Sequence, residues 1–269
     1  MGVMNITPDS FSDGGTLYAN AAVDLGKVRA TAQRMIAGGA SILDVGGEST
    51  RPGATPVSVE VELQRVIPVV AMLGELGTIV SVDTRHAEVA RCAIDAGADV
   101  INDVSAGADP KMIQVIAETS VGYGLMHMQG VPETMQQAPA YQAVVAEVRA
   151  YLASRVHACK LAGIAAERLW VDPGFGFGKT QQHNLSLLAD LERVRVGQLP
   201  LLVGLSRKRL LGEITGRETS ERVFASVAAA VLAVERGADL VRVHDVEATA
   251  DALKVLAAMR AVALASAAP

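Results

Sequence analysis

The sequence predicts an α/β protein that folds as a single (β/α)8 TIM barrel, with its active site at the C-terminal ends of the strands. Strand-like and helix-like segments alternate along 269 residues, a length typical of one such barrel. Three segments repeat one pattern, in which a helix end, Gly-Ala, a short apolar strand and a polar residue follow one another: 35–47, 93–105 and 233–245. We therefore expect residues 1–269 to form one domain.

Eight strands are expected once this pattern is applied to the whole chain. They are apolar without strict alternation, as in a parallel sheet that is covered on both faces. Three lie in the repeated segments, and the others are 2–6, 78–84, 122–128, 168–172 and 201–206. The glycine before each repeated strand suits a helix C-terminus, where left-handed backbone is needed.

A helix is expected after every strand. The eight helices are 23–37, 57–76, 87–95, 110–118, 141–162, 182–194, 221–235 and 249–264. An open doubly wound sheet is the alternative fold. However, no glycine-rich dinucleotide turn follows the first expected strand, and this favours the barrel.

Composition argues against several classes of function. The net charge of −5 gives no basic footprint for nucleic acid. There is no uncharged apolar run of membrane-spanning length, and no basic segment before an apolar core marks a secretion signal. A cytoplasmic location is therefore expected. Cys92 and Cys159 lack CxxC spacing and are expected to be ordinary thiols.

Polar side chains end every expected strand. An isolated Asp there is usually a turn or cap residue, but in a barrel all eight ends meet at one mouth. These residues are Asn5 with Thr7 and Asp9, Asp44, Asp83, Asn102 with Asp103, His127, Asp172, Ser206 with Arg207 and Lys208, and Arg242 with His244. The stretch "ILDVGGESTRPGATP" (42–56), which contains Asp44, is expected to form one wall of the site.

The residue types at this mouth predict the chemistry of its ligand. Buried acceptors require a partner, and a heterocycle with adjacent N–H donors would supply it to Asp83, Asn102 and Asp172. The cationic groups suit phosphate or another anion: Arg51, Lys208, Arg242 and His244. The sequence thus predicts a site for a flat, donor-rich ring beside an anionic group.

Two glycine-rich loops are expected to border the site. The first, "NITPDSFSDGG" (5–15), carries acids and one aromatic residue and is expected to act as a lid. The second, "DPGFGFGKT" (172–180), sets Phe175 and Phe177 among glycines. The chain has only four Phe residues, so two in one loop indicate ring contact with a ligand rather than core packing.

These motifs resemble those of the dihydropteroate synthase family of pterin-binding barrels, over essentially the whole chain. In the family's order they are "GVMNITPDSFSDGG", "LDVGGESTRPGA", "SVDT", "INDVS", "LMHMQG", "DPGFGFGK", "GLSRKR" and "RVHDV". The combination of "NITPDSFSDGG" with "GGESTRPGA" is the most specific. Family members usually carry several residues before the first strand, which here is expected from Gly2.

The resemblance implies a step of folate synthesis. It implies that (7,8-dihydropterin-6-yl)methyl diphosphate and p-aminobenzoate condense to 7,8-dihydropteroate and diphosphate, with SN1-like departure of the diphosphate and no strong general base. It also implies Mg2+ as cofactor, with Asn5 as its protein ligand. A homodimer through the last barrel helices is the oligomer that the resemblance implies.

The resemblance assigns further roles to residues of this chain. It implies catalytic roles for Asp83, Lys208, Arg242 and His244. It implies that the pterin diphosphate is bound by Thr50, Asp83, Asn102, Asp172, Lys208, Arg242, Val243 and His244. The residues that it assigns to the p-aminobenzoate pocket and the lid are Phe11, Asp13, Arg51, Phe177 and Arg209. Many members carry Ser at the position of Arg209, yet Arg and a helix N-terminus both suit a carboxylate.

Three alternatives differ from this function, one of them another enzyme and two of them proteins without catalytic activity. A methyltetrahydrofolate:corrinoid methyltransferase shares the barrel and the pterin acids but needs no diphosphate site, so "NITPDSFSDGG" and "SRKR" argue against it. A catalytically silent pterin-binding paralogue would have lost loop residues that are present here. A structural or interaction protein gives no reason for eight polar strand ends.

Overall fold

Eight short, mostly buried parallel strands form the centre of the molecule. The computed structural model describes residues 1–7, 17–19, 22–50 and 53–267. Six strands form one sheet in the order β1 (Gly2–Asn5), β4 (Ile42–Gly46), β5 (Ile79–Asp83), β6 (Val100–Asp103), β7 (Gly122–Met126) and β8 (Leu169–Asp172). The other two, β9 (Leu202–Val203) and β10 (Leu240–Val241), pair with each other in parallel.

Two isolated bridges close these strands into a ring. Val171 of β8 bridges Leu201, which precedes β9, and Gly2 of β1 bridges Val243, which follows β10. The Val3 N–H also donates to the Val243 carbonyl at 3.0 Å. An open sheet would leave two unpaired edges, whereas this ring is closed. The predicted (β/α)8 barrel is confirmed, and the alternative of an open doubly wound sheet is wrong.

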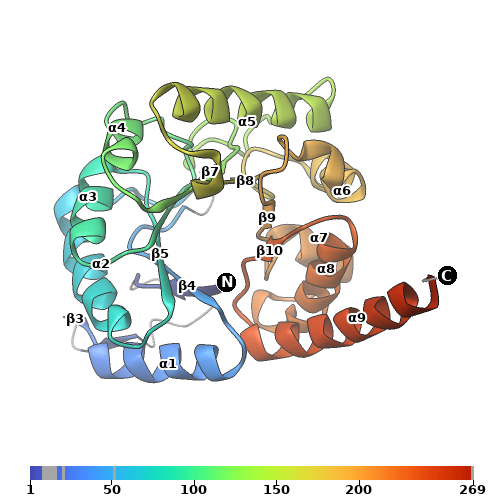
Figure 1. The fold of residues 1–269 in the computed structure, drawn as a ribbon, viewed down its shortest axis with the longest axis horizontal. Coiled ribbons are helices and arrows are strands. Elements are labelled where there is room, and N and C mark those ends of the chain that lie inside the picture. Colours follow the sequence, from blue (N-terminus) through green and yellow to red (C-terminus); the bar gives the residue numbers. More distant parts are fainter. Residues whose placement is uncertain (8–16, 20–21, 51–52, 268–269) are drawn as a thin grey trace.

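Helices surround the ring of strands on its outside (Figure 1). They are α1 (Leu25–Ala37), α2 (Val59–Gly74), α3 (Ala87–Asp95), α4 (Met112–Ala117), α5 (Val144–Leu161), α6 (Gln181–Ala189), α7 (Arg209–Thr215), α8 (Val223–Glu235) and α9 (Val246–Ala267). All eight expected helices are present. The short α7, which directly follows the cationic stretch "SRK", was not expected.

The Gly-Ala repeat has one structural meaning at all three places. Gly39, Gly97 and Gly237 adopt left-handed φ angles of +103°, +104° and +97°. The alanine after each glycine donates its N–H to the carbonyl five residues earlier, at 2.9 Å in every case. This is the hydrogen bond that ends a helix in a Schellman motif, and it turns the chain into the next strand.

Several boundaries differ from those expected. Instead of helix, Val23 forms part of a small hairpin of β2 (Tyr18–Ala19) and β3 (Ala22–Val23), and α1 begins only after Asp24, whose side chain accepts the Lys27 N–H. The helix expected over 182–194 ends at Ala189 and is followed by a 3-10 turn, Leu191–Val194. Two further 3-10 turns are Ala166–Arg168 and Thr219–Glu221.

Buried side chains fill the space between strands and helices. A second, smaller cluster near the N-terminal ends of the strands joins Val100, Trp170 and Leu202.

Both cysteines are free thiols, with Cys159 buried and Cys92 half-buried, as expected. Among the described helices, none is both long and apolar enough to cross a membrane.

Candidate active site

A cavity of about 920 Å³ opens at the C-terminal ends of the barrel strands. Every barrel strand or the loop that follows it contributes to the lining. Of the expected strand-end residues, those that line the cavity are Asn5, Thr7, Asp83, Asn102, Asp172, Ser206, Arg207, Lys208, Arg242 and His244. Asp9 lies outside the described residues. The convergence of polar strand ends on one mouth, inferred from the sequence, therefore occurs for six of the eight strands, whereas Asp44, Asp103 and His127 do not line the cavity.

Arg242 lies between two carboxylates at the centre of this cavity. Its Nε lies 2.5 Å from Asp44 Oδ2, and its Nη2 lies 2.9 Å from Asp83 Oδ2. Burial opposes the charge, but Asp44 and Asp83 outweigh burial and raise the pKa of Arg242. Asp44 is fully buried and does not line the cavity, so its expected place in the wall was wrong. It supports Arg242 from below.

Three acceptors surround the inner part of the cavity. Burial raises the pKa of Asp83 to about 7, although Arg242 opposes this. Burial also raises the pKa of Asp172, whose Oδ1 accepts the Gly174 N–H at 2.7 Å. The Asn102 amide, 5% exposed, donates to Asp44 Oδ2 at 3.4 Å. These groups suit a ring that offers several N–H donors.

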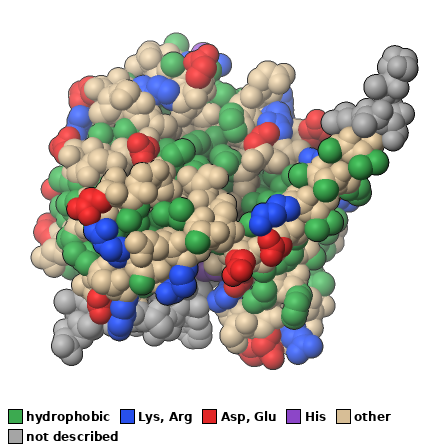
Figure 2. All heavy atoms as spheres, turned by 60° about the horizontal axis from the view of Figure 1, so that its bottom comes forward, with side chains coloured by type: hydrophobic (Ala, Val, Ile, Leu, Met, Phe, Trp, Pro, Cys, Tyr) green, Lys and Arg blue, Asp and Glu red, His purple; other side chains and the backbone are tan. Residues whose placement is uncertain are grey.

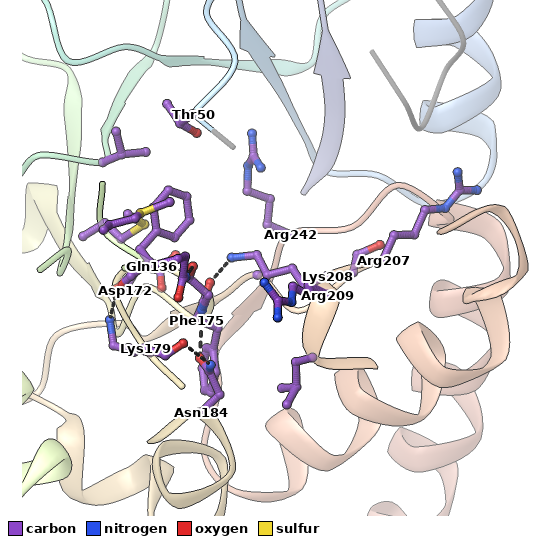
Figure 3. A pocket seen from close by; sticks show the side chains of 18 of the residues that line it. Thr50, Gln136, Asp172, Phe175, Lys179, Asn184, Arg207, Lys208, Arg209 and Arg242 are labelled. Atoms are coloured by element: carbon purple, nitrogen blue, oxygen red, sulfur yellow. Dashed lines mark hydrogen bonds between the residues drawn. The ribbon is translucent and has the colours of Figure 1, made fainter. Parts of the chain in front are cut away.

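Lys208 reaches the opposite side of the same space. Its ammonium donates to the Phe175 carbonyl, as Figure 3 shows, and lies 4.6 Å from the centre of the Phe177 ring. Burial lowers the pKa of Lys208 to about 8, although Asp172 opposes this. A cation over an aromatic face is stabilised by the ring's electron distribution. Lys208 and Phe177 thus form one edge of the cavity.

Phe175 does not have the role expected for it. The residue belongs to the cavity lining, but its side chain has no exposed surface and packs in the hydrophobic core. The expected contact between the Phe175 ring and a ligand was therefore wrong. Its backbone carbonyl instead holds Lys208. Phe177 is half-buried and lines the cavity, as expected.

A buried lysine that the sequence analysis missed holds this loop together. Lys179 is 3% exposed, and its Nζ donates to the carbonyls of Gly174 at 2.9 Å and Phe177 at 3.0 Å. It also lies 2.9 Å from His127 Nδ1. Burial, and to a smaller extent the charge of Lys179, lowers the pKa of His127 to about 3. The imidazole is therefore neutral, and its Nδ1 accepts a hydrogen bond from Lys179 Nζ. His127 does not line the cavity, contrary to expectation; it supports the loop from behind.

The connection between β7 and α5 forms a further wall that the sequence analysis missed. Met135, Gln136, Gln137 and Pro139 line the cavity. The Gln136 side-chain amide donates to the Gly176 carbonyl at 2.5 Å. This bond joins the wall to the loop of residues 172–180, called here the phenylalanine loop. The only sequence signal was a long polar stretch, "QGVPETMQQAPA", between a strand and a helix.

The segment after β4 carries Thr50 to the cavity. Glu48, Ser49 and Thr50 all line it. Glu48 is held by Arg85 through two bonds, at 2.8 Å from Nε and 3.0 Å from Nη2, and it accepts the Val57 N–H at 3.3 Å. Paired N–H···O bonds between arginine and carboxylate fix orientation as well as distance. Arg85 therefore anchors this segment.

The remaining predicted residues differ in where they lie. Asn5 and His244 line the cavity, and His244 Nδ1 lies 3.0 Å from Ser206 Oγ. The Arg209 side chain also lines it but is 79% exposed and pairs with Glu213 at 2.6 Å. Val243 is buried beside β1 and does not line the cavity. Phe11, Asp13 and Arg51 lie outside the described residues.

Two places in the described part of the chain carry side chains that can ligate a metal ion. The ligand atoms of Glu48, Glu62 and His86 lie within 4.8 Å of one another. This cluster does not fit a cation, because the Arg85 guanidinium bonds both oxygens of Glu48. The Asn5 amide oxygen, at the end of β1, fits a hard ion that takes most of its ligands from phosphate and water, as Mg2+ does.

Comparison with known proteins agrees with this geometry. A family model described as "Pterin binding enzyme" matches residues 1–244. The chain is 51% identical to the dihydropteroate synthase of Escherichia coli (strain K12) over 96% of this chain and 90% of that protein.

Two solved structures are also similar. The Yersinia pestis dihydropteroate synthase in a sulfonamide drug complex superposes with a TM-score of 0.93 and 44% identity, covering 97% of this chain and 94% of that one. The Burkholderia cenocepacia dihydropteroate synthase complexed with 7,8-dihydropteroate has a TM-score of 0.88 and 47% identity, covering 98% of this chain and 91% of that one.

Proposed function

The chain belongs to the dihydropteroate synthase family of pterin-binding enzymes, and we propose that it condenses (7,8-dihydropterin-6-yl)methyl diphosphate with p-aminobenzoate. The products are 7,8-dihydropteroate and diphosphate. One observation carries the proposal: three acceptors and two cations, all buried or half-buried, line a single cavity at the mouth of the barrel. The acceptors are Asp83, Asn102 and Asp172, and the cations are Lys208 and Arg242.

The pterin ring would occupy the inner part of this cavity. Its amino group and ring N–H groups would donate to Asp83 and Asn102, which are paired on β5 and β6, and to Asp172 at the end of β8. Lys208 would donate to the acceptor atoms of the ring. Arg242 would stack on the face of the ring, because Asp44 and Asp83 hold its guanidinium in one orientation.

The diphosphate would lie toward Asn5, Thr50 and His244, which line the cavity from β1, the β4 loop and β10. We propose that Asn5 supplies the protein ligand to Mg2+. The bound ion would neutralise charge on the leaving diphosphate. Arg242 and His244 would donate hydrogen bonds to the same oxygens, since both lie at the end of β10. The role predicted for Val243 would be indirect, through its bonds to β1.

The reaction then needs little proton transfer from the protein. The bond between the pterin methylene carbon and the diphosphate oxygen breaks, and its electron pair leaves with the diphosphate. The carboxylates of Asp83 and Asp172 stabilise the resulting pterin cation. The arylamine nitrogen attacks the methylene carbon and afterwards loses a proton to solvent. This sequence requires no nucleophilic side chain.

The p-aminobenzoate would enter beside Phe177 and Arg209 at the outer part of the cavity. The aromatic ring of Phe177 would contact the benzoate ring, and Arg209 at the start of α7 would attract the carboxylate. Phe11, Asp13 and Arg51 are proposed to complete this pocket. Closure of their loops would exclude water, which would otherwise capture the pterin cation.

We also propose a homodimer formed through α8 and α9. These helices expose large apolar side chains, among them Phe224 at 88%, Val255 at 72% and Val262 at 67%. Figure 2 shows apolar side chains along the helix that ends at the grey C-terminal residues. A second copy would cover this surface, which is unusually apolar for a monomer. The single domain and cytoplasmic location expected from the sequence remain predictions.

The reaction is tested by measuring diphosphate release with the pterin diphosphate and Mg2+, with and without p-aminobenzoate. We expect release only with the arylamine, in equal amount to 7,8-dihydropteroate. Asp83→Ala and Lys208→Ala should abolish both. Pterin binding without turnover would instead indicate the silent paralogue, and methyl transfer that depends on a corrinoid would indicate the methyltransferase.

A further inference from the structure

The turn that follows β9 has a backbone geometry that arginine rarely adopts. The Lys208 N–H donates to the Leu205 carbonyl at 3.2 Å, and Arg207 has a φ of +56° at the third position of this turn. Turns with a positive φ at that position favour glycine or asparagine, because a side chain costs free energy there. The side chain at this position must therefore have a compensating interaction.

That interaction is a bonded ion pair with the residue after His244. Arg207 Nε lies 3.0 Å from Asp245 Oδ2, and Nη2 lies 2.5 Å from Asp245 Oδ1. Both side chains are mostly buried, at 17% and 15% exposure. Two parallel bonds fix the guanidinium plane against the carboxylate. The pair ties the end of β9 to the end of β10.

The backbone of Arg207 is held as firmly as its side chain. Its N–H donates to the buried Ser226 hydroxyl at 2.9 Å, and its carbonyl accepts from Arg222 Nη1 at 3.1 Å. The same Arg222 nitrogen lies 3.4 Å from the Lys208 carbonyl. Together with the ion pair, these bonds fix the Arg207 backbone and side chain against the start of α8 and Asp245.

The two neighbours of Arg207 point toward the substrate cavity. Ser206 Oγ accepts the His244 N–H at 3.1 Å and lies 3.0 Å from His244 Nδ1. The Lys208 ammonium reaches the Phe175 carbonyl. In Figure 3 the Arg207 side chain extends in the opposite direction from that of Lys208. Arg207 also lines the cavity, but the positive φ directs its guanidinium to Asp245 rather than toward Lys208.

We propose that Arg207 is a positioning residue, whose ion pair with Asp245 holds Ser206 and Lys208 in register with His244. The sequence predicts Arg207 only as one of the polar groups at the strand ends. Asp245 instead uses its charge within the protein. The inference rests on the roles proposed above for Lys208 and His244.

Arg207→Gly tests this directly, because glycine keeps the turn and loses only the side chain. We expect kcat/KM for the pterin diphosphate to fall about tenfold to a hundredfold, the range that small displacements of a binding group produce. Asp245→Asn should give a similar loss, and the double variant Arg207→Gly/Asp245→Asn little more, because both changes break one interaction. The unfolding temperature should fall less in Arg207→Gly than in Asp245→Asn, because glycine removes the cost of the positive φ.

The pH profile adds a readout that general destabilisation would not change. Lys208 released from the Phe175 carbonyl would be better hydrated, so the alkaline limb of kcat/KM should move to higher pH. A matched control is Asp239→Asn, which breaks a pair with Arg195 (2.7 Å) at the opposite end of β10. This control should leave the profile and kcat/KM unchanged.

Two results would overturn different parts of the inference. If Arg207→Gly and Asp245→Asn keep kcat/KM and the alkaline limb within twofold of the wild type, while Lys208→Ala is inactive, Arg207 has no positioning role. If Lys208→Ala itself retains activity, the substrate site proposed around it is wrong, and the role of Arg207 falls with it.

Discussion

The guanidinium of Arg242 rests on the fully buried carboxylate of Asp44, with Nε 2.5 Å from Oδ2. Asp44 also accepts the Ser81 hydroxyl at 2.6 Å, so its position is fixed from two sides. Asp83 then bonds the other edge of the same guanidinium. Arg242 is in this way prepared for a substrate before one arrives, and no reorientation is needed on binding.

Asp44→Asn should therefore affect both stability and activity. Breaking a buried ion pair leaves a partner without compensation, and we expect the free energy of unfolding to fall by about 3 kcal/mol. The value of kcat/KM should fall at least about tenfold, because Arg242 loses its support. Denaturant unfolding and steady-state kinetics measure the two effects.

A matched control for this change is Asp251→Asn, which removes an exposed pair with Lys254 on α9. Exposed pairs contribute little, so stability should change by less than about 1 kcal/mol. Wild-type stability in Asp44→Asn would show that the pair with Arg242 does not hold the site.

The activity should depend on pH in a bell shape. Pterin donors require an ionised Asp83, whose pKa is raised to about 7, so kcat/KM should fall as the pH falls through that value. The ammonium of Lys208, whose pKa is lowered to about 8, is lost as the pH rises through that value. Asp83→Asn should remove the acid limb and Lys208→Arg the alkaline limb. A profile that is flat from pH 6 to pH 9 would contradict both assignments.

Gly124→Ala tests how closely the barrel interior is packed beneath the pterin site. An added Cβ would overlap the Trp170 indole nitrogen and lie 2.9 Å from Asn102 Oδ1. Overpacking of this kind should lower the free energy of unfolding by about 1–3 kcal/mol and weaken pterin binding through Asn102. Trp170 is the only tryptophan of the chain, so its fluorescence reports the displacement.

The control for this glycine is Gly74→Ala at the end of α2, where an added Cβ meets nothing within 4 Å. Alanine is the better helix former, so stability should stay equal or rise slightly. Equal behaviour of the two variants would mean that the contact between Gly124 and Trp170 is unimportant.

Lys179→Met should loosen the phenylalanine loop. Methionine fills similar space but cannot donate to the carbonyls of Gly174 and Phe177, and buried acceptors without partners cost about 1–3 kcal/mol each. We expect lower stability and a higher KM for p-aminobenzoate, measured with Lys111→Met, an exposed lysine, as the control. An unchanged KM for p-aminobenzoate would show that the bonds of Lys179 stabilise the loop without contributing to binding.

Much of this fold could be predicted because the barrel repeats one unit. The Gly-Ala helix ends recur with the same backbone geometry at Gly39, Gly97 and Gly237, and a barrel strand follows each of them. The helix α7 was missed because seven residues, Arg209–Thr215, carry too few apolar positions to show a period. Its end was signalled only by Gly216, with a φ of +68°.

The depth of side chains in the site could not be predicted from sequence. Asp44 and Asp83 both occur near the ends of apolar strands, yet Asp44 precedes the end of β4 by two residues and Asp83 is the last residue of β5. That difference puts Asp44 beneath the cavity and Asp83 in its lining. Phe175 lies in the core of a loop in which Lys179 bonds the carbonyls of Gly174 and Phe177, and no sequence pattern indicated these contacts.

The proposed function requires Asp83 to lie in the pterin pocket, and its contribution is measured by calorimetric binding of the pterin diphosphate with Mg2+. We expect Asp83→Ala to weaken binding at least about tenfold, because hydrogen bonds to a charged group contribute about 1.5–3 kcal/mol. Asp251→Asn should bind as the wild type does. Equal affinity in Asp83→Ala and the wild type would contradict the claim and move the pterin elsewhere.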